Sequence, residues 1–122
     1  MNTRKILIVS SDTELNGIIR ISALTLTKLN CQVSIIETDI PETALKESKI
    51  VNLDLIIIDL DDKKFNALNL IKEIRSDKDS KVKKIISVYS DKVDRDETYK
   101  AGCDSIMSKD ELKKVVNNIL QF

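Results

Sequence analysis

The segment from residue 53 to residue 62 constrains the fold more than any other part of the sequence. Leu55–Ile58 is an unbroken leucine and isoleucine run, and Asp59, Asp61 and Asp62 follow close behind it. Such a run, without polar alternation, is typical of a parallel strand covered by helices on both faces. Ligands of such sheets bind beyond the carboxyl ends of the strands. The pattern therefore predicts that Asp59 lies where an α/β protein keeps its functional site.

Composition indicates one compact domain that does not bind nucleic acid. The chain has 122 residues, of which 42% are apolar and 33% are charged, so it can bury one sizeable core. Its 20 basic and 20 acidic residues cancel to a net charge of zero, which gives no electrostatic footprint for a polyanion. We interpret the basic run at residues 81–84 as a solvated lead-in to a strand.

The residue types that are scarce exclude several kinds of chemistry. The sequence has no histidine, which removes histidine-dependent triads, imidazole metal sites and a phosphohistidine on this chain. Cys31 and Cys103 match no metal or disulfide spacing, so we expect both to be small buried residues. No apolar run reaches membrane-spanning length and no signal core is present, so we expect a cytoplasmic protein without membrane contact.

Apolar strand-like segments alternate along the chain with stretches that have helical spacing. The predicted strands cover residues 5–9, 32–37, 54–59, 85–89 and 105–107. The predicted helices follow from apolar positions or end signals in residues 15–29, 41–45, 68–75, 92–101 and 112–120. This alternation predicts a single parallel sheet with helices on both faces.

Local signals mark where several of these helices begin and end. Ser11 and Ser108 each open a capping-box pattern. Asp39 is a candidate cap before Pro41, a residue favoured in the first helical turn. Gly102 is expected to end the fourth helix, because glycine enters the left-handed conformation without steric cost.

In this order along the chain, the motifs resemble the receiver domain of bacterial two-component response regulators. The resemblance rests on residues 5–14, on 54–59 with 70–75, on 101–104, and on Lys109. It covers essentially the whole chain and implies a doubly wound, flavodoxin-like α/β fold with strand order 2-1-3-4-5 and five helices. We therefore expect a single receiver-like domain over residues 1–122, with no output domain in this sequence.

The resemblance implies specific roles for Asp59 and Lys109. Asp59 would accept a phosphoryl group from a phosphohistidine on a partner kinase, and Lys109 would reach across to it. The pairing is physically sensible, because a phosphoryl group in transfer needs positive charge on its oxygens. The plainer alternatives are a strand-terminating turn residue for Asp59 and a surface lysine in a capping turn for Lys109.

The sequence departs from the family pattern at the metal site. The acidic pair that holds a divalent metal in the family falls on Ser10 and Ser11, and neutral hydroxyls are poor ligands for Mg²⁺. Asp12, Asp59 and Asp61 remain as acids, so we expect at most weak Mg²⁺ binding and no other cofactor. Asp12 is equally well interpreted as a helix-start residue, and Asp61 as an ordinary loop acid.

The positions that the family uses as a conformational switch are also altered. By the best register, the small hydroxyl residue of strand four becomes Tyr89 and the aromatic residue of strand five becomes Ile106, although a one-residue slip places Ser90 in the first position. Asp110 replaces the proline expected after the lysine. A cis bond there would cost about 3 kcal/mol, so we expect a trans peptide and a changed approach of the lysine.

Three functions fit these residues. We prefer an atypical receiver that acts by protein–protein interaction, with weak or no phosphorylation of Asp59. The alternative is a conventional receiver, whose only chemistry is its own phosphorylation at Asp59 by a kinase or a small phosphodonor. Expected partners are a histidine kinase or a downstream signalling protein, and a homodimer through the last strand and helices is one expected assembly.

The third function belongs to a different class, an enzyme, because residues 56–61 also resemble the nucleophile strand of haloacid-dehalogenase-like phosphatases. In that alternative Asp59 would attack the substrate and Asp61 would act as the general acid. That motif normally lies on the first strand, whereas here it lies on the third predicted strand.

Overall fold

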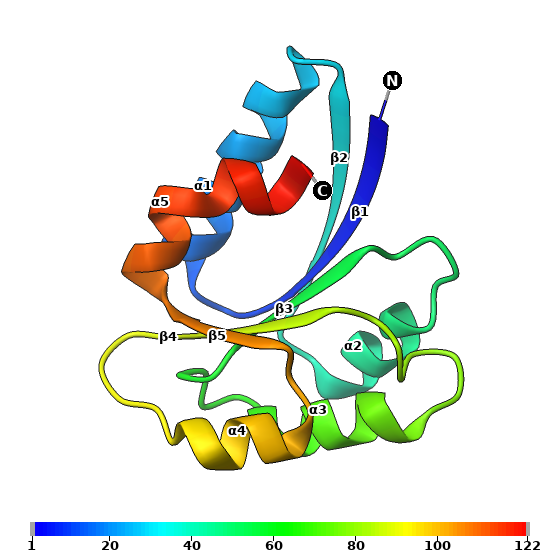
Figure 1. Ribbon diagram of the computed structural model, residues 1–122, viewed down its shortest axis with the longest axis vertical. Coiled ribbons are helices and arrows are strands. Elements are labelled where there is room, and N and C mark those ends of the chain that lie inside the picture. The colour runs from blue at the N-terminus through cyan, green and yellow to red at the C-terminus, as the bar shows by residue number, and fades with distance from the viewer. Residues whose placement is uncertain (1, 122) are drawn as a thin grey trace.

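The computed structural model describes residues 2–121, in which five strands alternate with five helices, as predicted (Figure 1). The strands are β1 (Asn2–Val9), β2 (Cys31–Thr38), β3 (Leu55–Asp59), β4 (Ile85–Tyr89) and β5 (Ser105–Ser108). The helices are α1 (Thr13–Thr27), α2 (Pro41–Ser48), α3 (Ala67–Ser76), α4 (Arg95–Ala101) and α5 (Lys109–Gln121).

All strand pairs are parallel, and the sheet order is β2-β1-β3-β4-β5, which confirms the predicted topology. The register places Ile57 of β3 opposite Ile8 of β1 and Ile86 of β4. Because every strand runs the same way, their carboxyl ends meet at one edge of the sheet. The segments that follow β1, β3, β4 and β5 are therefore brought together there.

The sheet separates two hydrophobic layers. Helices α1 and α5 cover one face, and α2, α3 and α4 cover the other (Figure 1). Strand β3 serves both layers: Ile57 packs with the α1 and α5 side, while Ile56 and Ile58 pack with the α2, α3 and α4 side. All five residues of β3 are buried, which explains why its sequence is apolar without alternation.

Helix α1 begins one residue later than its capping pattern predicted. The carboxylate of Asp12, not the hydroxyl of Ser11, caps the helix by accepting a 3.1 Å hydrogen bond from the backbone N–H of Leu15. The Ser11 hydroxyl is engaged elsewhere, because it donates to Asp62 at 2.8 Å. Leu29, predicted to continue the apolar stripe, lies beyond the end of α1 and is exposed.

The start of α2 also corrects a predicted cap. Pro41 is the first residue of the helix, as expected, but Ile40 precedes it and no side chain caps the helix. Asp39 instead forms an ion pair with Lys64 at 3.0 Å, which removes its carboxylate from the helix terminus. The helix continues to Ser48, further than predicted.

The remaining predicted helix ends are mostly confirmed. Gly102 ends α4 with φ of 124°, a conformation that side chains other than glycine rarely adopt. Ser108 accepts a 3.0 Å hydrogen bond from a backbone N–H in the first turn of α5. Helix α4 begins at Arg95, later than the predicted Lys92, because the Asp94 carboxylate caps it.

The basic run before β4 has a structural role in addition to its predicted position. The ammonium of Lys83 donates to the carbonyl oxygens of Ile50, Val51 and Leu53 at 2.8, 3.0 and 3.2 Å. It thereby ties the segment after α2 to the start of β4, so this lysine is not simply solvated.

Two further expectations concern the cysteines and the membrane. Cys31 and Cys103 are buried and form no disulfide, as predicted. Within residues 2–121, no helix combines the length and the apolar character needed to cross a membrane.

Candidate functional site

Four charged side chains meet at the carboxyl edge of the sheet. Asp59 is the last residue of β3, Asp61 follows it, Asp12 follows β1, and Lys109 is the first residue of α5, directly after β5. Asp59 is only 2% exposed, so it forms the floor of the site. The parallel topology explains this meeting of residues that lie far apart in the sequence.

Both carboxylate oxygens of Asp59 have partners. Its Oδ2 accepts a hydrogen bond from the hydroxyl of Ser10 at 2.7 Å and lies 3.0 Å from the ammonium of Lys109. Its Oδ1 accepts a hydrogen bond from the backbone N–H of Asp61 at 2.9 Å. These three donors connect Asp59 to the segment after β1, to the start of α5 and to its own loop.

The ammonium of Lys109 lies among three carboxylates. It is 3.0 Å from an oxygen of Asp12, 3.0 Å from Asp59 and 3.1 Å from Asp61. Burial lowers the pKa of Lys109, but hydrogen bonds to these three acids and their negative charge raise it well above its ordinary value of 10.5. The lysine is therefore firmly protonated at neutral pH.

The two outer carboxyl groups are held ionised by their neighbours. Burial raises the pKa of Asp12, but the backbone hydrogen bond from Leu15 and the contact with Lys109 lower it below its ordinary value. Burial likewise raises the pKa of Asp61, but hydrogen bonds from Ser90 and Lys109 lower it. Asp12 is thus the helix-start residue that the sequence allowed, and its carboxylate also contacts Lys109.

The serines after β1 replace metal-ligating acids in the family pattern, and here they act as hydrogen-bond donors. Ser10 bonds to Asp59, while the hydroxyl and the backbone N–H of Ser11 both bond to Asp62 at 2.8 and 2.7 Å. Sequence reasoning missed these bonds. The available signal was two serines at the end of one strand and acids at the end of its neighbour in the predicted sheet.

The predicted switch positions lie on the opposite face of the sheet from α1 and α5. Tyr89 and Ile106 both pack with the layer under α2, α3 and α4. The Tyr89 hydroxyl accepts a 3.3 Å hydrogen bond from Arg95, whose guanidinium also lies 5.9 Å from the ring centroid. Ser90, the alternative position, is the residue whose side chain hydrogen-bonds to an acid of the site, Asp61.

The residues present do not fit a divalent metal. Mg²⁺ demands oxygen ligands at about 2.0–2.1 Å, whereas the three carboxylates surround an ammonium at hydrogen-bond distances of 3.0–3.1 Å. The hydroxyl groups of Ser10 and Ser11 are engaged with carboxylates. Among residues 2–121, no group of three or more acidic or cysteine side chains is arranged to hold a metal ion.

The peptide bond after Lys109 is trans, as predicted, since the described residues contain no cis peptide bond. Lys109 and Asp59 are nonetheless 3.0 Å apart, so the lysine reaches the acid without the proline of the family pattern.

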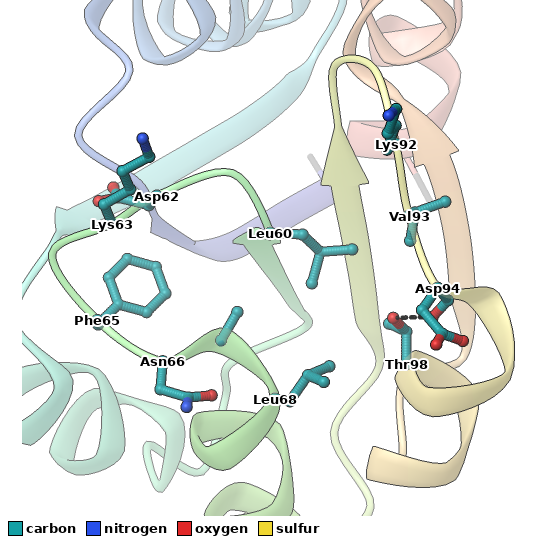
Figure 2. Close-up of a pocket in the computed structure, with 11 residues that line it drawn as sticks. Leu60, Asp62, Lys63, Phe65, Asn66, Leu68, Lys92, Val93, Asp94 and Thr98 are labelled. Atoms are coloured by element: carbon teal, nitrogen blue, oxygen red, sulfur yellow. Dashed lines mark hydrogen bonds between the residues drawn. The ribbon is translucent and has the colours of Figure 1, made fainter.

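A cavity of about 610 Å³ lies between the β3–α3 segment and the β4–α4 segment (Figure 2). Figure 2 shows the Phe65 ring on the side of the β3–α3 segment and Val93 and Thr98 across from it, with Leu60 and Leu68 between. Its remaining lining residues are Asp62, Lys63, Asn66, Ala67, Lys92 and Asp94. The cavity shares Asp62 with the edge of the site, but its lining does not include Asp59 or Lys109.

A five-stranded parallel sheet in the order 2-1-3-4-5, with helices on both faces, is the fold of response-regulator receiver domains, and this chain has that fold. The manganese-bound form of response regulator Rcp1 matches with a TM-score of 0.78 and 18% identity, over 98% of this chain and 93% of its own. No protein-family model and no curated protein sequence matches the chain.

Two further solved structures carry the same fold. The phosphorylated cyanobacterial phytochrome response regulator RcpA has a TM-score of 0.78 and 16% identity, over 96% of this chain and 91% of its own. The receiver domain of sensor histidine kinase PA1611 from Pseudomonas aeruginosa PAO1 has magnesium in its active-site cleft. It matches with a TM-score of 0.75 and 20% identity, over 98% of this chain and 95% of its own.

Proposed function

We propose that this chain is a receiver domain of two-component signalling that acts by protein–protein interaction, with weak or no phosphorylation of Asp59. Three neighbouring structures include a manganese-bound regulator, a magnesium-bound receiver and a phosphorylated regulator. The present chain shares their fold but differs at the residues that would support such states. A cytoplasmic location and a histidine kinase or downstream signalling protein as partner belong to the same proposal.

The observation that carries this proposal is the set of internal contacts that Asp59 makes. The carboxylate is 2% exposed, and Ser10, Lys109 and the Asp61 amide together engage both of its oxygens. A nucleophilic attack on a phosphodonor needs a free oxygen and a cation to neutralise the transferred group. Here each Asp59 oxygen accepts at least one internal hydrogen bond and Lys109 already pairs with three carboxylates, so phosphorylation would compete with these contacts.

A conventional receiver is the alternative, since Asp59 and Lys109 retain the acceptor and lysine positions. Their separation of 3.0 Å would allow the lysine to contact a phosphoryl group on Asp59. We favour the atypical mode, because Ser10 and Ser11 supply no charge for a divalent cation.

The phosphatase alternative is disfavoured by the environment of Asp61. A general acid needs a raised pKa so that it carries a proton at neutral pH. Burial acts in that direction, but hydrogen bonds from Ser90 and Lys109 lower the pKa of Asp61 instead. The receiver fold also places Asp59 at the end of the third strand, not the first.

Incubation with acetyl phosphate and Mg²⁺, followed by intact-protein mass spectrometry, tests the proposal. The expected result is little or no adduct on the wild type under conditions that fully modify a conventional receiver run in parallel. Asp59→Asn is the matched control, because any adduct that survives it lies on another residue. A stoichiometric adduct that disappears in Asp59→Asn would establish the conventional alternative and overturn the proposed mode.

A further inference from the structure

The ammonium of Lys109 has as many N–H donors as there are carboxylates around it. An ammonium has three N–H donors and no acceptor, and Lys109 hydrogen-bonds to Asp12, Asp59 and Asp61. Its side chain is 11% exposed, so these bonds form in a largely water-excluded place. In this geometry all three N–H donors of the lysine have an acceptor inside the protein, so the ammonium does not need water as a hydrogen-bond partner.

The three acids also accept hydrogen bonds from other groups of the protein. Asp12 accepts from the Leu15 backbone N–H with its other oxygen, at 3.1 Å. Asp59 accepts from Ser10 and from the backbone of Asp61, and Asp61 is bonded by Ser90. The carboxylate oxygens of Asp12, Asp59 and Asp61 thus form a cage around the ammonium, and Ser90 supports the cage from the segment after β4.

We infer that the Lys109 ammonium is the resident cation of this site and takes the place of the divalent metal that the receiver fold implies. This inference deepens the proposed function and rests on its assignment of the site. While Lys109 is in place, the carboxylates bind no divalent cation. Without it, three carboxylates would face one another with no positive charge between them, which strongly favours uptake of a cation.

The inference has a consequence for the signalling state. The lysine joins the β5–α5 junction to the segments after β1 and β3 through bonds that need neither metal nor phosphate. We therefore expect the contact of the lysine with the acceptor edge to be independent of metal concentration.

Titration of the full chain with Mn²⁺, followed by calorimetry and by thermal unfolding, tests this inference. The wild type is expected to show no saturable binding. Lys109→Met, which keeps most of the length of the side chain without its charge, is expected to gain one Mn²⁺ site at least about tenfold tighter than the weakest binding that the wild-type titration would detect, equivalent to about 1.4 kcal/mol. Its melting midpoint should rise by about 3–5 °C when Mn²⁺ reaches about five times the dissociation constant.

Two variants control for the site. Lys113→Met removes another α5 ammonium, which pairs with Glu14 at 2.9 Å outside the cage, and should gain no Mn²⁺ binding. Adding Asp12→Asn to Lys109→Met should abolish the gained binding, because one of the three acids is lost. Equal Mn²⁺ binding by wild type and Lys109→Met, or no binding by a folded Lys109→Met, would overturn the inference.

The wild-type arm decides the inference even if Lys109→Met fails to fold. Saturable Mn²⁺ binding by the wild type that disappears in Asp59→Asn means that the lysine is not the resident cation. A wild type that shows no saturable Mn²⁺ binding supports the inference. Failure of the proposed function has a different signature, an Asp59-dependent phosphoryl adduct. The adduct assay run with EDTA in place of Mg²⁺ separates the two, because an adduct formed without metal contradicts the proposed function alone.

Discussion

Ser10 donates a 2.7 Å hydrogen bond from its hydroxyl to Asp59, which lies 49 positions away in the sequence. This bond joins the ends of the neighbouring strands β1 and β3. Ser10 is itself 3% exposed, and its oxygen also accepts a 3.0 Å hydrogen bond from the backbone N–H of Asp12. A residue that looks like a lost metal ligand is thus a structural link between the acceptor acid and the start of α1.

Replacing Ser10 by alanine should destabilise the fold. The change leaves a buried carboxylate and a backbone N–H each one partner short, which is expected to cost about 1–3 kcal/mol of unfolding free energy. Urea unfolding followed by circular dichroism measures this loss. Ser76→Ala, which removes an exposed hydroxyl bonded within its own helix, is the control and should change stability by less than about 0.5 kcal/mol. Equal effects of the two variants would contradict the role assigned to Ser10.

Removal of the Lys109 charge should cost far more stability than removal of the Lys113 charge. Lys109→Met leaves three acids without their common cation, and we expect a loss of about 2–4 kcal/mol, below the full cost of a deeply buried pair because Asp12 and Asp61 are partly exposed. Lys113→Met breaks a surface pair and should cost much less stability. Chemical denaturation in EDTA, where no metal can compensate, makes the comparison; a similar loss in both would show that the cage contributes no more than a surface pair.

The two glycines provide a matched test of backbone conformation. A methyl group added at Gly102 would lie 2.5 Å from Cγ of Arg75, and the backbone φ there is 124°. Arg75 cannot easily move away, since its Nε donates to the Gly102 carbonyl at 2.6 Å and its guanidinium pairs with Asp104 at 2.9 Å. We expect Gly102→Ala to destabilise the protein by about 1–3 kcal/mol.

Gly17, by contrast, lies inside α1, and an added methyl group would meet nothing closer than 3.7 Å. Gly17→Ala should therefore stabilise the protein by roughly 0.5–1 kcal/mol, because alanine loses less backbone freedom in a helix. Thermal unfolding of both variants checks the signs, and two shifts in the same direction would refute the expectation.

Stability should fall at both extremes of pH, for opposite reasons. Burial raises the pKa of Asp12, Asp61 and Asp62, but hydrogen bonds outweigh it and leave each pKa below 3.8. Their contribution is present above that value and is lost as the pH falls through the lower folded-state pKa. The pKa of Lys109 is raised, so its contribution is complete below 10.5 and is lost as the pH rises above that value.

The acid side of this profile can be assigned with one pair of variants. Asp62→Asn should flatten the loss of unfolding free energy below about pH 4, because Asp62 no longer changes protonation on folding. Ser11→Ala removes one of the hydrogen bonds that lower the pKa of Asp62 and should flatten it partly. Urea titrations across the acid range measure the slope, and an unchanged slope in Asp62→Asn would remove this carboxyl from the explanation.

The sequence predicted the architecture because the relevant signals are local. Apolar runs such as Leu55–Ile58 indicated buried parallel strands, and the receiver resemblance supplied their order, which the structure confirms. Gly102 and Ser108 were assigned correctly because each acts on backbone groups within a few residues. Asp39 and Ser11 failed as caps because distant partners, Lys64 and Asp62, competed for their side chains.

By itself, then, the sequence determined the element order, the buried strand and the place of Asp59 at the sheet edge, since hydrophobic periodicity and turn chemistry depend only on near neighbours. Only the tertiary structure decided which acids surround Lys109. It also decided that Ser10 donates a hydrogen bond to Asp59 and that Ser90 contacts Asp61. Asp12 and Lys109 lie 97 positions apart. Contacts of that kind depend on how strand crossovers and side-chain rotamers combine in space, and no local pattern in the chain encodes that combination.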